Sequence, residues 1–281
     1  MTVAPLERTA TPEAAIGGRP PRASTPRVIR TLARVEGRKL LRHPAFIAGI
    51  ALSGALVLLA GWGRKSHSVV EPLWPAGSPI GPLAVFGFVA ANLAALRDRV
   101  NGTEELFGST AVPRQARTAA LLVSVAWAVG AGIVLLAPFV GAFAVAYGVS
   151  LAEVVKLLEE PLIVAVLALA GVAVGRLLPT RLAGPVAAFL ALVLMGAYAH
   201  PTLGLQFLAL YVIPDSLPSV GWHLLYLAGI GTLAAAVALM KDGVRRSLVV
   251  AAAVGVLAIA AGAILQLPAS CPGGGAPCVF R

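Results

Sequence analysis

Two segments of the chain hold residues whose types and spacing could do chemistry, and the first is a polar stretch at residues 97–117. In this stretch an acidic pair is followed at once by an apolar pair, with arginines on both sides; the residues are Glu104, Glu105, Leu106, Phe107, Arg97, Arg99 and Arg114. Apolar side chains rimmed by charged ones are typical of a surface that meets another protein. The stretch therefore predicts recognition of a protein partner, and the alternative is a solvated hairpin without one.

The second segment is the tail CPGGGAPC, in which Cys271 and Cys278 are separated by glycines and prolines that permit a tight turn. The topology derived below places this tail outside the cell, where an oxidising environment favours a disulfide. A bridge that closes so short a loop contributes somewhat less than ~3 kcal/mol through loop entropy. Two free thiols are the alternative. A zinc site is disfavoured by the cysteine spacing and by the lack of histidine in the tail.

The familiar catalytic motifs are absent from the sequence. It has no Gly-rich phosphate loop of the Walker type, no HExxH, no GxSxG and no Cys/His metal cluster. We therefore expect that this chain is not an enzyme, that it holds no cofactor or metal of its own, and that it does not hydrolyse ATP by itself.

Long charge-free stretches show where the two polar segments must lie. Only 12% of the residues are charged, against about a quarter in soluble proteins. Apolar runs of about 18 residues can cross a hydrocarbon core about 30 Å thick. Such spans fit at 45–62, 79–96, 118–147, 161–178, 182–199, 224–240 and 247–267. The sequence thus predicts an all-α polytopic membrane protein with a bundle of about seven transmembrane helices.

The distribution of basic residues sets the orientation. With the N-terminus in the cytoplasm, most of the 22 Lys and Arg residues fall in cytoplasmic segments, as the positive-inside rule requires. The net charge of +10 is then explained without nucleic acid. The apolar stretch 202–213 is too short to cross upright, so we predict that residues 200–223 form an external segment that is interfacial or re-entrant. The C-terminus becomes extracytoplasmic.

Residues 27–43 (RVIRTLARVEGRKLLRH) have helical periodicity before the first span. Five arginines fall on one side, namely Arg27, Arg30, Arg34, Arg38 and Arg42. Apolar residues fill much of the other side, where Glu36 and Lys39 interrupt them. This pattern predicts an amphipathic elbow helix in the cytoplasmic headgroup layer, either as a topology anchor or as a docking site for a cytosolic partner. The preceding residues 1–26 are predicted to be a disordered cytoplasmic tail.

Few polar groups lie inside the predicted spans, and they reduce to residues such as Asn92, Ser53 and Ser124. An ion-coupled transporter would need buried ionisable groups, so that class is disfavoured. Gly171 and Gly175 have the GxxxG spacing that allows helices to approach closely. His223 is expected to be an interfacial residue at a span end.

Four stretches together resemble the membrane subunits of ABC-2-type exporters, in particular the actinobacterial branch. They are ARVEGRKLLRHPAF (33–46), RVNGTEELFGSTAVPRQART (99–118), GRLLPTRLAGPVAAF (175–189) and GWHLLYLAGIG (221–231). The resemblance implies an elbow helix at 27–43, a coupling helix within 97–117, and a six-span permease core at 44–246. The chain extends this pattern by a seventh helix at 247–267 and the tail 268–281.

By the same resemblance, two permease subunits pair as a homo- or heterodimer in a bacterial plasma membrane. They sit on separate cytosolic ABC ATPase subunits, which bind the ATP and Mg. The coupling contact would be made by Glu104, Glu105, Leu106 and Phe107, with the three arginines beside them. The alternative function is a non-transporting membrane scaffold or sensor that recruits a cytosolic regulatory protein.

Overall fold

The computed structural model describes residues 25–61, 80–102, 112–147, 156–178, 180–198 and 217–266, and within them every regular element is an α-helix. The helices are α1 (Thr25–Leu41), α2 (Pro44–Gly61), α3 (Gly81–Val100), α5 (Arg114–Tyr147), α7 (Glu159–Leu177), α8 (Ala183–Tyr198), α9 (Leu217–Met240) and α10 (Arg246–Gln266). The predicted all-α fold is confirmed for these residues.

Four of the helices are long and apolar enough to cross a membrane, namely α5, α7, α9 and α10. The pair formed by α1 and α2 adds a fifth if it is counted as one bent span. The apolar part of α3 is shorter, because it ends where the polar residues near Arg97 begin. These helices are compatible with a membrane protein, and the count of seven stays a prediction.

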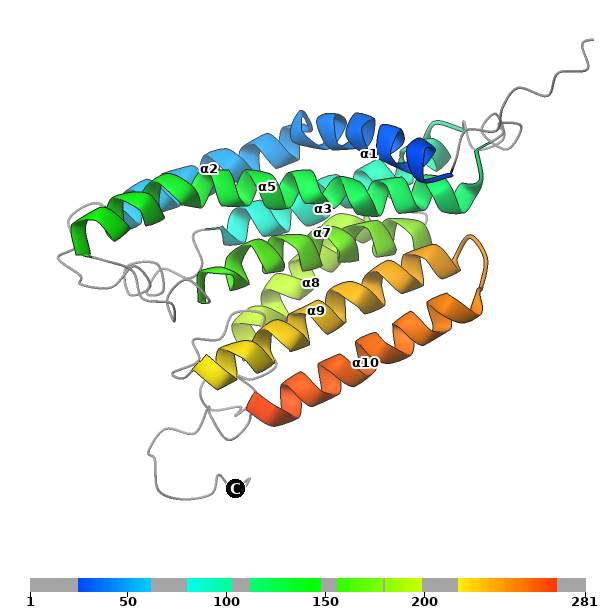
Figure 1. The fold of residues 1–281 in the computed structure, drawn as a ribbon. Coiled ribbons are helices and arrows are strands. Elements are labelled where there is room, and N and C mark those ends of the chain that lie inside the picture. The colour runs from blue at the N-terminus through cyan, green and yellow to red at the C-terminus, as the bar shows by residue number, and fades with distance from the viewer. Residues whose placement is uncertain are drawn as a thin grey trace, which may run out of the picture.

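The helices lie side by side along one general direction (Figure 1). Helix α7 packs against α3, α9 and α5, and it is the most deeply buried of the candidate spans. The hairpin of α9 and α10 forms one edge of the bundle, and the elbow of α1 and α2 lies over α5 at the opposite edge (Figure 1). Helices α3 and α7 thus form the centre of the fold.

Small residues let α3 and α7 approach closely. A Cβ atom on Gly171 would overlap the backbone carbonyl of Phe88, and one on Gly175 would lie 2.7 Å from the carbonyl oxygen of Asn92. The side chain of Asn92 is fully buried between the helices and donates from Nδ2 to the carbonyl of Gly171 at 3.3 Å. Both glycines of the GxxxG pair therefore face α3.

A second glycine-lined contact joins α9 to α10. A Cβ on Gly229 would lie 2.8 Å from the carbonyl oxygen of Gly255, and a Cβ on Gly262 would lie 2.7 Å from that of Trp222. Such backbone proximity is typical of helix pairs in membranes, where close van der Waals packing drives association. Helix α10 thus packs on the bundle through one narrow glycine-bearing face.

The opposite edge is shaped by the chain's turn from α1 into α2, which bends by 62°. Pro44 begins α2, and the Nδ1 atom of His43 accepts the backbone N–H of Ala45 at 3.3 Å, so His43 caps this helix. Ser53 on α2 accepts the N–H of Leu83 at 2.9 Å, which satisfies a donor in the first turn of α3.

Large apolar side chains remain exposed on the outward faces of α2, α5, α8 and α10, including Leu58, Val134, Phe189 and Leu257. A water-soluble monomer rarely exposes large apolar side chains on so many of its helices. Lipid or other subunits would cover these faces.

Several helix ends differ from the sequence predictions. Helix α5 begins at Arg114, and α7 begins at Glu159. Helix α9 begins at Leu217, so the last residues of the predicted re-entrant segment are its first turns. The rest of that segment, the tail 1–24, the loop residues 103–111 and the cysteine tail lie outside the described residues.

The α3–α7 contact yields a stability prediction. Gly171→Ala should destabilise the protein by about 1–3 kcal/mol, because the added methyl group meets backbone that cannot move alone. The matched control is Gly130→Ala within α5, where a Cβ has nothing within 4 Å. That change should be neutral or stabilising by up to about 1 kcal/mol. Thermal unfolding in detergent measures both, and equal shifts for the two variants would contradict the assignment of this contact.

Candidate functional site at the basic end of the bundle

Polar contacts join the helix ends at the end of the bundle that carries the segment 97–117. Gln115 of α5 donates from Nε2 to the carbonyl of Gly243 at 2.9 Å, and Thr118 donates to the carboxylate of Asp242. Both acceptors lie in the turn between α9 and α10. Gly243 has a φ of +145°, a conformation that favours glycine. The start of α5 is therefore fixed to that turn.

The end of α3 is fixed in a similar way. Arg99 donates from Nη1 to the carbonyl of Arg176 at 3.2 Å, near the C-terminus of α7. Asn101 and Gly102 then turn the chain, with their N–H groups bonded to the carbonyls of Arg97 and Arg99. Gly102 has a φ of +65°, as expected for a residue that ends a helix.

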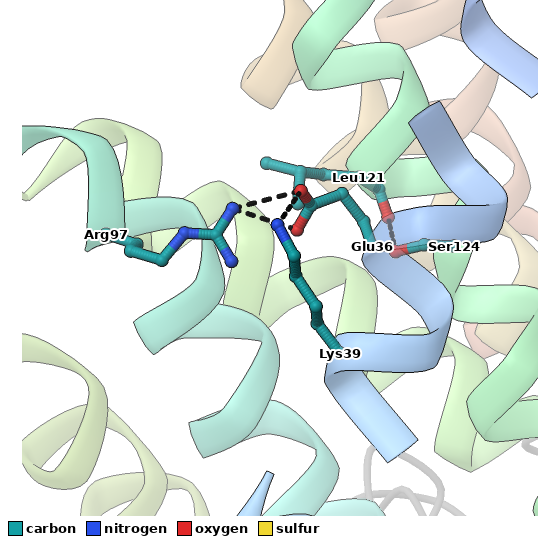
Figure 2. A network of polar contacts seen from close by, with 5 residues as sticks. All are labelled: Glu36, Lys39, Arg97, Leu121 and Ser124. Carbon is teal, nitrogen blue, oxygen red and sulfur yellow. Dashed lines mark hydrogen bonds and ion pairs between the residues drawn. The ribbon is translucent and has the colours of Figure 1, made fainter. Parts of the chain in front are cut away.

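An ion-pair network connects α1 to α3 (Figure 2). Arg97 donates from one guanidinium nitrogen to both carboxylate oxygens of Glu36, at 2.9 and 3.1 Å, and Lys39 lies 3.4 Å from the same carboxylate. The Glu36 side chain is only 15% exposed. Glu36 and Lys39 are the two residues that interrupt the apolar side of α1. Glu36 interrupts the apolar side of α1 because it pairs with Arg97 of α3, and Lys39 lies there because it pairs with Glu36.

The elbow helix presents its arginines outward and its small residues inward. Arg27, Arg30, Arg34, Arg38 and Arg42 are all exposed. Ala33 and Leu40 are buried, and a Cβ on Gly37 would overlap the ring of Trp127 on α5. The inner side of α1 therefore packs on α5.

A cavity of about 330 Å³ lies beside the Glu36 network. Its basic side chains come from three elements: Lys39 from α1, Arg97 from α3 and Arg181 from the turn before α8. Its apolar wall includes Leu40 and Leu93. His43 also lines it, and burial lowers the pKa of that imidazole below its ordinary value, which favours the neutral ring.

The predicted coupling residues divide into two groups. Arg97, Arg99 and Arg114 lie at this basic end, where Arg97 and Arg99 hold α3 in place and Arg114 is the exposed first residue of α5. Glu104, Glu105, Leu106 and Phe107 lie outside the described residues. The described residues on both sides bring the two ends of that segment to the same end of the bundle.

A buried polar cluster at the other end was missed by sequence reasoning. The Nε2 atom of His223 lies 3.2 Å from a carboxylate oxygen of Glu159, and its Nδ1 atom lies 3.1 Å from Oε1 of Gln266. The side chains of His223 and Glu159 are each 1% exposed, and Tyr226 stacks on the imidazole at 5.8 Å between ring centroids. The cluster thus joins α7, α9 and α10.

One sequence expectation is corrected by this cluster. Glu159 and Glu160 precede the predicted span 161–178, yet both lie in α7 and are buried. His223 was expected at a span end, and its side chain is buried on α9. The sequence contained a signal for this earlier start of α7, because two acidic residues followed by Pro161 are typical of the first turn of a helix. Their partners on α9 and α10 could not be found from spacing along the chain.

Two of the three polar groups predicted inside the spans join helices, and the third bonds within its own helix. Asn92 bonds to α7 and Ser53 caps α3, as described above, while Ser124 donates to the carbonyl of Leu121 within α5 at 2.7 Å (Figure 2). Each is therefore used within the bundle.

The Glu36–Arg97 pair yields a second prediction. Glu36→Gln and Arg97→Gln should each destabilise the protein, and the double variant should lose less than the sum, with a coupling of about 1 kcal/mol. The value is modest because the Arg97 side chain is 37% exposed. Thermal unfolding of the four proteins at low salt measures the coupling. Strictly additive losses would show that the contact adds no stability.

Comparison with known proteins finds no match: no protein-family model, no curated protein and no solved structure matches this chain.

Proposed function

We propose that this chain is the membrane-spanning subunit of an ATP-driven exporter of the ABC-2 type, which takes its energy from separate cytosolic ATPase subunits. The observation that supports this most is the anchoring of the segment 97–117. Its two ends are tied to α1, α7 and the α9–α10 turn by Arg97, Arg99, Gln115 and Thr118. A partner that moved this segment would act on most of the bundle.

Force could pass from this segment through helices that are stiff along their axes. Helix α3 continues from the segment into the central contact with α7, and α5 continues from it across the length of the bundle (Figure 1). Domain movements of this kind use packed elements that shift as units. In the proposed mechanism, ATP binding closes the ATPases, displaces the segment 97–117, and changes how α3 and α5 sit against the other permease helices.

The proposed topology has seven spans, a cytoplasmic N-terminus and an extracytoplasmic C-terminus. The ends of α3 and α7, the start of α5 and the α9–α10 turn meet at one end, and all carry basic residues. Under the positive-inside rule this end faces the cytoplasm.

The buried Glu159–His223 pair does not favour ion-coupled transport in this proposal. Glu159 is the first residue of α7 and Gln266 is the last residue of α10, so the cluster lies near helix ends. Coupling groups of secondary transporters lie near the midplane of the bilayer. We assign the cluster a packing role between the three helices.

The first functional prediction concerns coupling. The chain should co-purify with an ABC ATPase, and replacing Glu104 and Glu105 together by lysine should abolish stimulation of that ATPase by the permease, because both charges at the contact are reversed. ATP hydrolysis by the reconstituted complex in nanodiscs provides the measurement.

The matched control replaces Glu7 and Glu13, in the N-terminal tail, by lysine. It changes the net charge equally on the same predicted side. Unchanged stimulation in the loop variant, or equal loss in the control, would contradict the assignment. A stoichiometric partner without ATPase activity would favour the scaffold or sensor.

The topology gives a further prediction in a background with both native cysteines replaced by serine. A membrane-impermeant maleimide should modify Lys156→Cys in intact cells and should modify Arg245→Cys only after permeabilisation. These residues flank opposite ends of the bundle, before α7 and before α10. The reverse pattern of labelling would invert the orientation and remove the proposed contact with cytosolic ATPases.

A further inference from the structure

We propose that the cavity between α1, α3 and the α7–α8 turn binds the phosphodiester headgroup of an anionic phospholipid, with the start of the lipid's acyl chains against the half-buried Leu93 and Ala94 of α3. This inference goes beyond the proposed function, since a headgroup site of this kind could exist whether or not the chain works with an ATPase.

The first argument is the polarity gradient along α3. The cavity is lined by Ala90, Leu93, Ala94, Leu96, Arg97 and Val100 of α3 and by Asn101 directly after it. Ala90, Leu93, Ala94, Arg97 and Asn101 lie on one face, and Leu96 and Val100 lie beside it. The sequence along that face changes from apolar to polar toward the basic end of the bundle. Ala90 and Arg97 are about 10 Å apart along the helix axis. A phospholipid has the same gradient from acyl chain to headgroup.

The second argument is charge. Lys39, Arg97 and Arg181 line the polar part of the cavity, and the single carboxylate of Glu36 pairs with the first two. The basic side chains therefore outnumber this acid. Arg181 is exposed, and the Lys39 and Arg97 side chains are 53% and 37% exposed, so a headgroup can reach them. Basic pockets between membrane helices on the cytoplasmic side are typical sites for anionic headgroups.

The third argument is the surface around the cavity. The volume of about 330 Å³ is sufficient for a headgroup. Leu178 and Leu182, on either side of the turn that carries Arg181, are exposed by 52% and 73%. Both lie outside the cavity lining, and they give the turn that carries Arg181 an exposed apolar surface. A free phosphate ion would use only the basic part of this arrangement.

The test uses the purified full-length protein and three probes: dioleoyl phosphatidylglycerol, dioleoyl phosphatidylcholine and glycerol phosphate. Native mass spectrometry measures the binding constants. Phosphatidylglycerol should bind at least about tenfold more tightly than either other probe. The double variant Lys39→Gln/Arg181→Gln should bind it about thirtyfold more weakly than the unmodified protein, since each basic residue near an anionic headgroup contributes about fivefold.

Two further variants make the result specific. Arg245→Gln/Arg246→Gln removes two exposed charges at the same end of the bundle but outside the cavity, and it should bind phosphatidylglycerol like the unmodified protein. Leu93→Trp leaves every charge in place but fills the apolar part of the cavity, and it should weaken lipid binding by about tenfold or more. Arg97 is left unchanged, so Glu36 keeps its partner and the fold is preserved.

The proposal is overturned by any of four results. These are equal affinity for phosphatidylcholine, equal affinity for glycerol phosphate, full binding by the Lys39/Arg181 variant, and an equal loss in the Arg245/Arg246 control. Equal affinity for glycerol phosphate would identify an anion site without lipid specificity. None of these results depends on whether an ATPase co-purifies, so failure of this site and failure of the exporter proposal are distinguishable.

Discussion

Close backbone approach between α3 and α7 is the constraint on which the rest of this fold depends. Apolar side chains gain little by leaving lipid for a neighbouring helix, so association in a membrane needs close van der Waals contact and interhelical hydrogen bonds. Gly171 and Gly175 permit that contact, and the buried amide of Asn92 adds a hydrogen bond. Gly184, at the start of α8, also fits against Asn92, where a Cβ would overlap the amide. Three helices thus meet around one buried polar side chain.

The polar groups at the two ends of the bundle differ in their burial. At one end the charged groups are mostly exposed or half-buried, and Arg97 shares Glu36 with Lys39 beside an open cavity. At the other end Glu159, His223 and Gln266 are buried together. The first arrangement leaves basic groups accessible to ligands and partners, whereas the second uses its polar groups to hold three helices together.

The difference between the exposed basic end and the buried polar cluster supports both the proposed function and the proposed lipid site. The segment 97–117 begins and ends on residues that are fixed to other helices, so displacement there would be transmitted into the bundle. Arg97, at the start of the same segment, also lines the neighbouring cavity. A lipid bound in the cavity would contact the elbow helix α1 and also α3, which leads to the predicted coupling residues. The lipid composition of the membrane would then affect the segment that the proposed ATPase partner contacts.

The sequence alone predicted the all-α fold and most of the helices. Long charge-free runs must be helical in a bilayer, since an unpaired backbone group is costly there, and the predicted spans at 45–62 and 247–267 differ from α2 and α10 by a single residue at each end. Gly171 and Gly175 were also identified from their GxxxG spacing.

What the sequence did not determine was which helix each polar side chain would meet. Glu36 appeared as a defect in an amphipathic pattern, and only packing brought it to Arg97, 61 positions away along the chain. Glu159 fell just before a predicted span and His223 at the end of another, and only packing brought the two side chains together, 3.2 Å apart. Periodicity along a helix fixes which face a residue occupies, and the tertiary structure decides what that face touches.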